Sequence, residues 1–96
     1  MISAEQKRTI IKILSPYSPK KLGVFGSYAR GENTSKSDLD LLVEFGVSVT
    51  LFDLICLEHD LSDSLGIKVD LVTERALSPY IRPYVERDYQ PIINEG

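Results

Sequence analysis

Apolar residues recur at helical spacing in two long stretches of the chain. In the first stretch they are Ile10, Ile13, Leu14 and Tyr17, and in the second they are Leu54, Leu57, Leu61 and Leu65. The first stretch follows Ser-Ala-Glu-Gln at 3–6, a capping box, and precedes Pro16 and Pro19. The second lies between Thr50, which opens a similar box with Asp53, and Gly66. The pattern predicts a helix from residue 4 that the prolines end, and a helix over 51–65.

Three short apolar runs bounded by turn residues are typical of buried strands: 21–25, 39–45 and 68–73. A brief helical turn over 27–30 and an exposed loop over 31–37 join the first two strands, so these should pair antiparallel. The predicted helix over 51–65 makes a crossover to the third strand, which should therefore lie parallel to the second. The expected fold class is α/β (α+β), with a mixed three-stranded sheet and helices packed mainly on one face.

The segment 78–96 is the least regular part of the pattern. Ser78 and Pro79 are typical of a helix start, and a helix through Arg87 should follow, although Pro83 limits its regularity. Residues 90–93 form either a fourth, edge strand or a segment packed against the core. The tyrosines at positions 80, 84 and 89 fit either packing or a partner surface.

Composition and charge narrow the range of functions that this chain could have. A chain of 96 residues predicts a single domain over 1–96, and 43% hydrophobic with 26% charged residues is ordinary for a globular protein. Neither a signal peptide nor a membrane span is visible, which predicts a cytoplasmic protein. The single Cys56 and single His59 leave no zinc cluster, so any metal should be a hard ion held by oxygen. A net charge of −3 argues against direct nucleic-acid binding.

Two short motifs carry candidate chemistry. Gly26 and Ser27 form a small-residue turn, and ten residues separate Ser27 from Asp38, which forms an Asp-x-Asp pair with Asp40. Side chains at i and i+2 of a strand share a face, and Asp70 on the parallel neighbour should reach the same point. Three carboxylates at one place repel each other unless cations neutralise them, which predicts a site for two divalent ions.

The Gly-Ser turn would supply the other half of a nucleotide site. Glycine permits close backbone approach, and the hydroxyl and free N–H groups near Ser27 can bind phosphate. Arg30, one turn later, could face the same anion or form a salt bridge to Glu32 or Glu44, and both interpretations stay open. We therefore expect Gly26, Ser27 and Arg30 to bind nucleotide.

These motifs resemble the signature of the DNA polymerase β nucleotidyltransferase superfamily. The compact form, including Ser-Asp-Leu-Asp-Leu-Leu-Val-Glu-Phe at 37–45, is most similar to the minimal nucleotidyltransferase (MNT) antitoxins paired with HEPN ribonuclease toxins. The resemblance implies transfer of AMP from ATP, with Mg²⁺, to a tyrosine of the HEPN partner. It also implies that Ser27 holds the β- and γ-phosphates, that Asp38 and Asp40 bind both ions, and that Asp70 binds one ion and helps to activate the acceptor.

Two other functions remain open at this stage. The chain could neutralise a toxin by binding alone, or it could modify a small molecule such as an antibiotic. The short chain leaves no room for an acceptor domain, which favours a macromolecular acceptor over a small one. A homodimer and a hetero-oligomer with the toxin are both compatible with the sequence.

Overall fold

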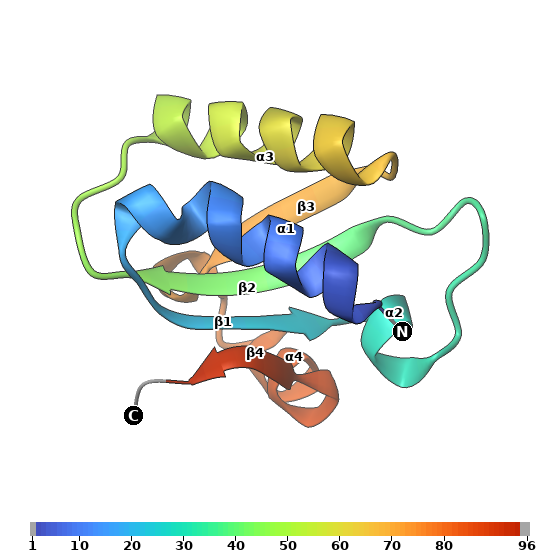
Figure 1. Cartoon of the computed structure of the whole chain (residues 1–96). Coiled ribbons are helices and arrows are strands. Elements are labelled where there is room, and N and C mark those ends of the chain that lie inside the picture. Colours follow the sequence, from blue (N-terminus) through green and yellow to red (C-terminus); the bar gives the residue numbers. More distant parts are fainter. Residues whose placement is uncertain (1, 95–96) are drawn as a thin grey trace.

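The computed structural model describes residues 2–94 and shows a four-stranded sheet with helices on both of its faces (Figure 1). The elements are α1 (Ala4–Leu14), the 3₁₀ helix η1 (Ser15–Tyr17), β1 (Pro19–Phe25), α2 (Ser27–Arg30), β2 (Leu39–Phe45), α3 (Leu51–Leu65), β3 (Val69–Thr73), the 3₁₀ helix η2 (Glu74–Ala76), α4 (Arg82–Asp88) and β4 (Gln90–Asn94). None of the helices in this range has the length and hydropathy needed to cross a membrane.

The sheet has the strand order β3-β2-β1-β4. As predicted, β1 pairs antiparallel with β2, and β2 pairs parallel with β3. The fourth strand, which the sequence left open, is present and pairs antiparallel with β1. The sheet is therefore mixed, and β1 is an interior strand.

Both long helices begin at the predicted capping boxes. The Ser3 hydroxyl accepts from the Gln6 amide at 3.1 Å, and the Gln6 side chain accepts from the Ser3 amide at 2.7 Å. Thr50 and Asp53 make the equivalent pair at 3.1 and 3.0 Å. These bonds satisfy donors that a helix start would otherwise leave free, so they fix where α1 and α3 begin.

Two proline positions differ from the prediction. Pro19 lies inside β1, because α1 already ends at Leu14 and the chain reverses at Ser18, which has a φ of 51°. Pro83 lies in the first turn of α4, which starts at Arg82 and not at Ser78. A first-turn residue needs no hydrogen-bonded N–H, so Pro83 favours the start of this helix and does not interrupt it.

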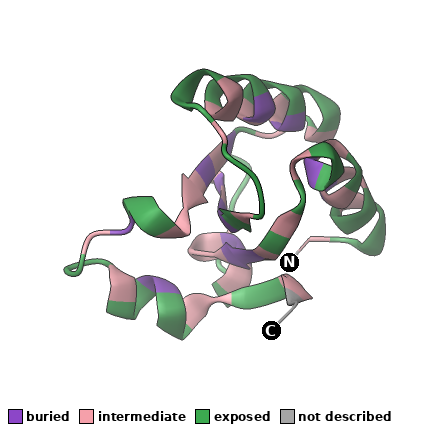
Figure 2. Cartoon of the chain, turned by 90° about the vertical axis from the view of Figure 1, so that its left-hand side faces the viewer, coloured by how far each residue is buried: buried purple, intermediate pink, exposed green. Residues whose placement is uncertain are grey.

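Side chains alternate between the two faces of the sheet, so the apolar residues form two separate clusters. Leu39, Leu41 and Val43 of β2 belong to the large cluster under α1 and α3. Leu42 points to the opposite face, where it packs with Leu77 and Val85 of the C-terminal segment. Figure 2 shows exposed residues on the outer sides of the helices and buried ones in the strands. The prediction of helices mainly on one face holds for α1 and α3, whereas α4 lies on the other face (Figure 1).

Side chains of α3 cover the free edge of β3. The Glu58 carboxylate accepts from the Leu71 amide at 2.7 Å, and the Ser62 hydroxyl accepts from the Val69 amide at 3.0 Å. An edge strand with free N–H groups is a template for pairing with other chains. These two bonds therefore satisfy and shield the outer edge of the strand that carries Asp70.

We expect Glu58→Ala to lower the free energy of unfolding by about 1 to 2 kcal/mol, because it leaves the Leu71 amide without its acceptor. Glu58→Gln keeps an acceptor oxygen and should lose less than half of that. Urea denaturation followed by circular dichroism measures both changes, with the exposed Asp60→Ala as the control. Equal stability of the alanine and glutamine variants would contradict the role assigned to this bond.

Candidate functional site

The pairing of β2 with β3 brings two of the predicted carboxylates together. Asp40 and Asp70 are direct partners in the parallel register, and Phe25 at the end of β1 is the partner of Asp40 on the other side. The ends of three chain segments therefore meet at one place, as the order of elements predicted. Asp40 and Asp70 alternate with residues of the large cluster, so both side chains belong to the sheet face that carries α4.

The environment of Asp40 disfavours a negative charge. Burial, the charge of Asp70 and the charge of Asp38 raise the pKa of Asp40 to about 6, and a hydrogen bond with the Asp70 carboxyl acts in the same direction. The positive charge of Arg30 opposes these effects and is the weakest of them. The carboxyl is therefore partly protonated near pH 6, because the charge of Arg30 does not offset burial and the two adjacent acids.

Asp38 lies just before β2 and is more open to solvent. Its side chain is 40% exposed, and its Oδ2 lies 3.8 Å from Nζ of Lys68. The structure thus places Lys68, two positions before Asp70 in the sequence, beside Asp38. Within residues 2–94, no three acidic, histidine or cysteine side chains are already gathered as a metal site. The convergence of Asp38 with Asp40 and Asp70 on shared ions thus stays a prediction.

The donor set nevertheless fits a divalent cation. Adjacent carboxylates supply the hard oxygen ligands that Mg²⁺ prefers. Asp40 and Asp70 here share a hydrogen bond and repel each other when both are charged. A cation between them would replace the proton and remove the repulsion.

Two features of the structure require a glycine at position 26: the conformation of its backbone and the closeness of Asp40. It has φ 75° and ψ −153°, a conformation that is strained for any residue with a Cβ. A Cβ at this position would also overlap Oδ2 of Asp40. The turn therefore lies directly against the carboxylate pair, and α2 begins with Ser27 immediately after it. The predicted phosphate contact of Ser27 remains a prediction.

Arg30 is bound by two acids in this structure. Its Nε donates to Glu32 at 3.1 Å, and its Nη1 donates to Asp88 of α4 at 2.6 Å. Of the two proposed salt-bridge partners Glu32 is therefore correct and Glu44 is not. The role of Arg30 in nucleotide binding stays a prediction, since its guanidinium already has partners here.

Asp88 is the residue that sequence reasoning missed. Its side chain is only 9% exposed, and it joins α4 to α2 across 58 positions of the chain. Neither spacing nor composition signals a contact over such a separation.

Together, Asp40, Asp70 and Gly26 place two interacting carboxylates beside a glycine turn, an arrangement that can hold a triphosphate through metal ions.

Comparisons with known proteins agree with this geometry. The family model described as nucleotidyltransferase domain matches residues 5–92. The protein adenylyltransferase MntA of Thermococcus cleftensis is 36% identical over 93 residues, which cover 92% of this chain and 94% of the relative. A relative from Methanocaldococcus jannaschii, provisionally named a protein adenylyltransferase, is 44% identical over 81% of this chain and 84% of its own.

Solved structures share the fold. A toxin-antitoxin crystal structure with AMP-PNP matches with a TM-score of 0.82 and 26% identity, over 92% of this chain and 73% of that one. A tri-AMPylated Shewanella oneidensis HEPN toxin in complex with an MNT antitoxin matches with a TM-score of 0.76 and 23% identity, over 94% and 71%, which shows likeness of fold. The chain therefore belongs to the nucleotidyltransferase domain family and is a nucleotidyltransferase of the protein adenylyltransferase group.

Proposed function

We propose that this chain is an antitoxin that transfers AMP from ATP to a tyrosine hydroxyl of a HEPN ribonuclease toxin. The observation that carries the proposal is the direct pairing of Asp40 with Asp70 beside Gly26. The MntA relative supports protein adenylylation, and the toxin-antitoxin structure with AMP-PNP supports a nucleotide substrate. ATP as the substrate, a HEPN protein as the partner and the cytoplasm as the location are parts of the same proposal.

The reaction needs few groups. The acceptor hydroxyl oxygen bonds to the α-phosphorus of ATP, the bond from that phosphorus to the bridging oxygen breaks, and pyrophosphate leaves. Asp70, the direct partner of Asp40 in the parallel register, would take the hydroxyl proton. Gly26 and Ser27 would hold the β- and γ-phosphates while the acceptor approaches.

Asp38, Asp40 and Asp70 would hold the metal. Two Mg²⁺ ions, when bound, neutralise the triphosphate and lower the pKa of an attacking hydroxyl. Rotation of Asp38 away from Lys68, which lies 3.8 Å away, would complete the ligand set, and a side chain that is 40% exposed has room for this rotation.

Labelled ATP tests the proposal. The chain is incubated with Mg²⁺, ATP labelled at the α-phosphate and the HEPN protein encoded next to it. We expect label on the HEPN protein, and a rate lower by about three orders of magnitude for Asp38→Asn/Asp40→Asn, since the loss of metal ligands removes about 4 kcal/mol of transition-state stabilisation. The control Asp60→Asn/Asp63→Asn removes two exposed acids of α3 and should match the wild type.

The outcome distinguishes catalysis from occlusion. Absence of label, together with protection from the toxin that survives Asp38→Asn/Asp40→Asn, would leave a binding antitoxin and overturn the enzymatic proposal. Mass spectrometry of the labelled HEPN protein identifies the modified residue. Label on a residue other than tyrosine would overturn the acceptor assigned here.

A further inference from the structure

An exposed aromatic surface lies at α4. Tyr80, Ile81 and Tyr84 are 87%, 49% and 61% exposed, and we refer to them as the α4 surface. Tyr89, in contrast, packs against Gly23 and is partly buried against the smaller cluster. We infer that the α4 surface is where the acceptor protein docks during AMP transfer, an inference that rests on the function proposed above.

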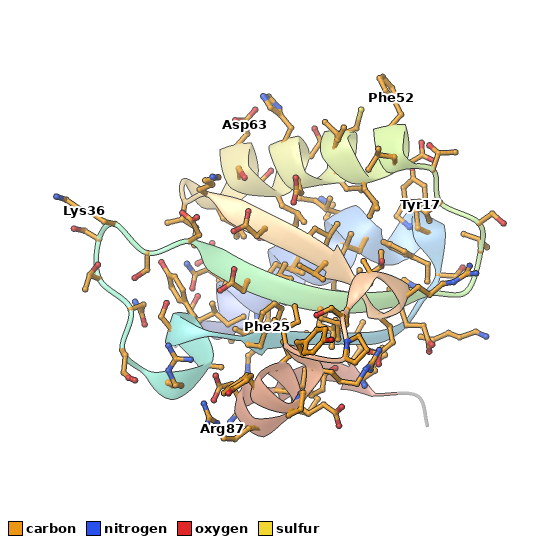
Figure 3. All side chains as sticks on the ribbon, turned by 180° about the vertical axis from the view of Figure 1, so that it is seen from behind. Tyr17, Phe25, Lys36, Phe52, Asp63 and Arg87 are labelled. Atoms are coloured by element: carbon orange, nitrogen blue, oxygen red, sulfur yellow. The ribbon has the colours of Figure 1, made fainter. Side chains whose placement is uncertain are left out.

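The α4 surface and the carboxylates share one face of the sheet. Leu42, two positions after Asp40 on the same strand, packs with Leu77 and Val85. Val85 belongs to α4, so this helix lies on the side to which Asp40 points. Figure 3 shows this face with β2 and β3 in front and α4 beside them. A molecule that approaches the carboxylates from solvent therefore meets α4 as well.

A typical protein interface is large enough that an acceptor at the carboxylates would also contact the α4 surface. A specific complex buries about 800 Å² on each partner, which corresponds to a patch of roughly 16 Å radius. The principal extents of the chain are 33, 31 and 24 Å. An acceptor centred on Asp40 and Asp70 would thus cover most of this face, including the exposed residues of α4.

Salt bridges hold the α4 surface in a fixed position. Arg82 donates to the Glu74 carboxylate at 2.6 Å and to the Glu74 carbonyl at 3.2 Å at the start of α4. Asp88 at its end accepts from Arg30 at 2.6 Å, which ties the helix to α2 and the glycine turn. A docking surface fixed relative to the reacting groups reduces the entropy lost when the acceptor binds.

The chemistry of the surface suits an apolar protein patch with an acid at its edge. Tyrosines contribute large contact areas and a polar end, and they are enriched where interfaces gain most of their energy. Arg87 lies over Tyr84, with its Cζ 5.5 Å from the ring centre, and its side chain is 67% exposed. Glu86 is an exposed acid in the same helix. Arg87 also lies 3.5 Å from Asp88 of its own chain, and its exposed positive charge next to Tyr84 would favour an acid at the edge of the acceptor patch.

A second apolar surface provides the matched comparison. Leu51, Phe52 and Ile55 of α3 are 74%, 74% and 56% exposed. Phe52 points away from the sheet in Figure 3, and α3 covers the opposite face from α4. An acceptor bound there could not present its hydroxyl to Asp70, so these residues are a control of similar exposure and hydrophobicity.

The test compares Tyr80→Ser/Tyr84→Ser with Leu51→Ser/Phe52→Ser. Calorimetry measures the affinity for the purified neighbouring HEPN protein, labelled ATP measures transfer, and binding of AMP-PNP with Mg²⁺ reports on the nucleotide site. We expect the tyrosine variant to bind the HEPN protein at least about 30-fold more weakly, the effect of losing an interface hot spot. Its affinity for AMP-PNP should stay within twofold of the wild type, and the α3 variant should bind both as the wild type does.

Each outcome has a different meaning. If the wild type labels the HEPN protein and the tyrosine variant binds it equally well, or the α3 variant loses as much affinity, the docking inference is wrong and the proposed function stands. If the wild type binds the HEPN protein without labelling it, catalysis fails, and the affinities still decide for or against the α4 surface. If the wild type neither binds nor labels the HEPN protein, both proposals fail.

Discussion

Gly26→Ala is expected to lower the free energy of unfolding by about 3 kcal/mol and to slow AMP transfer by roughly 100-fold or more. The backbone at φ 75° and ψ −153° strains any residue with a side chain. The added methyl group would also occupy the position of the Asp40 carboxylate. Asp40 would have to leave its place beside Asp70, so the substitution damages the site and the fold together.

Gly31 provides a close control for this prediction. Its φ of 72° is nearly the same as that of Gly26, but its ψ of 21° places it in the less strained left-handed helical region, and nothing lies within 4 Å of a Cβ built on it. Gly31→Ala should cost only about 1 kcal/mol, the strain of the left-handed conformation, and should leave transfer within threefold of the wild type. Thermal unfolding and labelled-ATP assays of the two variants measure the difference. Equal losses would contradict both the greater backbone strain and the contact with Asp40 that are assigned to Gly26.

Asp40→Asn should make the metal-free protein more stable at pH 7.5 by about 1 to 2 kcal/mol, a value discounted for solvent screening. Burial and the charges of Asp70 and Asp38 raise the pKa of Asp40 from 3.8 to about 6 in the folded chain. The folded state thus binds a proton more tightly than the unfolded state does, and the resulting stabilisation is lost as the pH rises through 6. Asparagine stays neutral and avoids that loss, while it can still donate a hydrogen bond to Asp70.

The pH dependence separates this effect from a general change in packing. Below pH 3.8 Asp40 is protonated in both states and resembles asparagine, so the gain should fall steadily from pH 7.5 to pH 4.5. Thermal unfolding in EDTA measures this gain in stability as a rise in the melting temperature. For a domain of this size the rise is about 4 to 8 °C per kcal/mol. Asp60→Asn, an exposed acid on α3, should show no such change. A gain that is the same at every pH would exclude the carboxylate charge as its cause.

Local sequence signals predicted much of the fold and the carboxylate pair. The capping boxes at Ser3 and Thr50 act within four residues, so the starts of α1 and α3 could be predicted directly. The crossover rule placed β3 parallel to β2, and this parallel pairing is what brings Asp70 to Asp40. The site could be predicted from sequence because the strands that carry it follow one another along the chain, joined by a short loop or by a helix.

Features that depend on distant partners could not be predicted in this way. Arg30 had several acids within reach in sequence, and only the tertiary structure brings Asp88 to it. The local sequence around the three C-terminal tyrosines does not signal which one is buried. Tyr89 is placed against Gly23 by the pairing of β4 with β1, whereas Tyr80 and Tyr84 lie in solvent. Exposure is decided by the neighbours that the fold supplies, and residue type does not encode it.

The pairing of β4 with β1 also has a consequence for the order of folding. A loop with α2 joins β1 to β2, and α3 joins β2 to β3, whereas β4 must find β1 across most of the chain, with Asn94 opposite Lys21. Long-range contacts carry a larger loop-closure cost and form later. We therefore expect a nucleus of β1, β2, β3 and α3 that already carries the carboxylates, onto which the C-terminal segment docks last. Hydrogen exchange should then find the amides of β4 and α4 opening at lower free energy than those of β2.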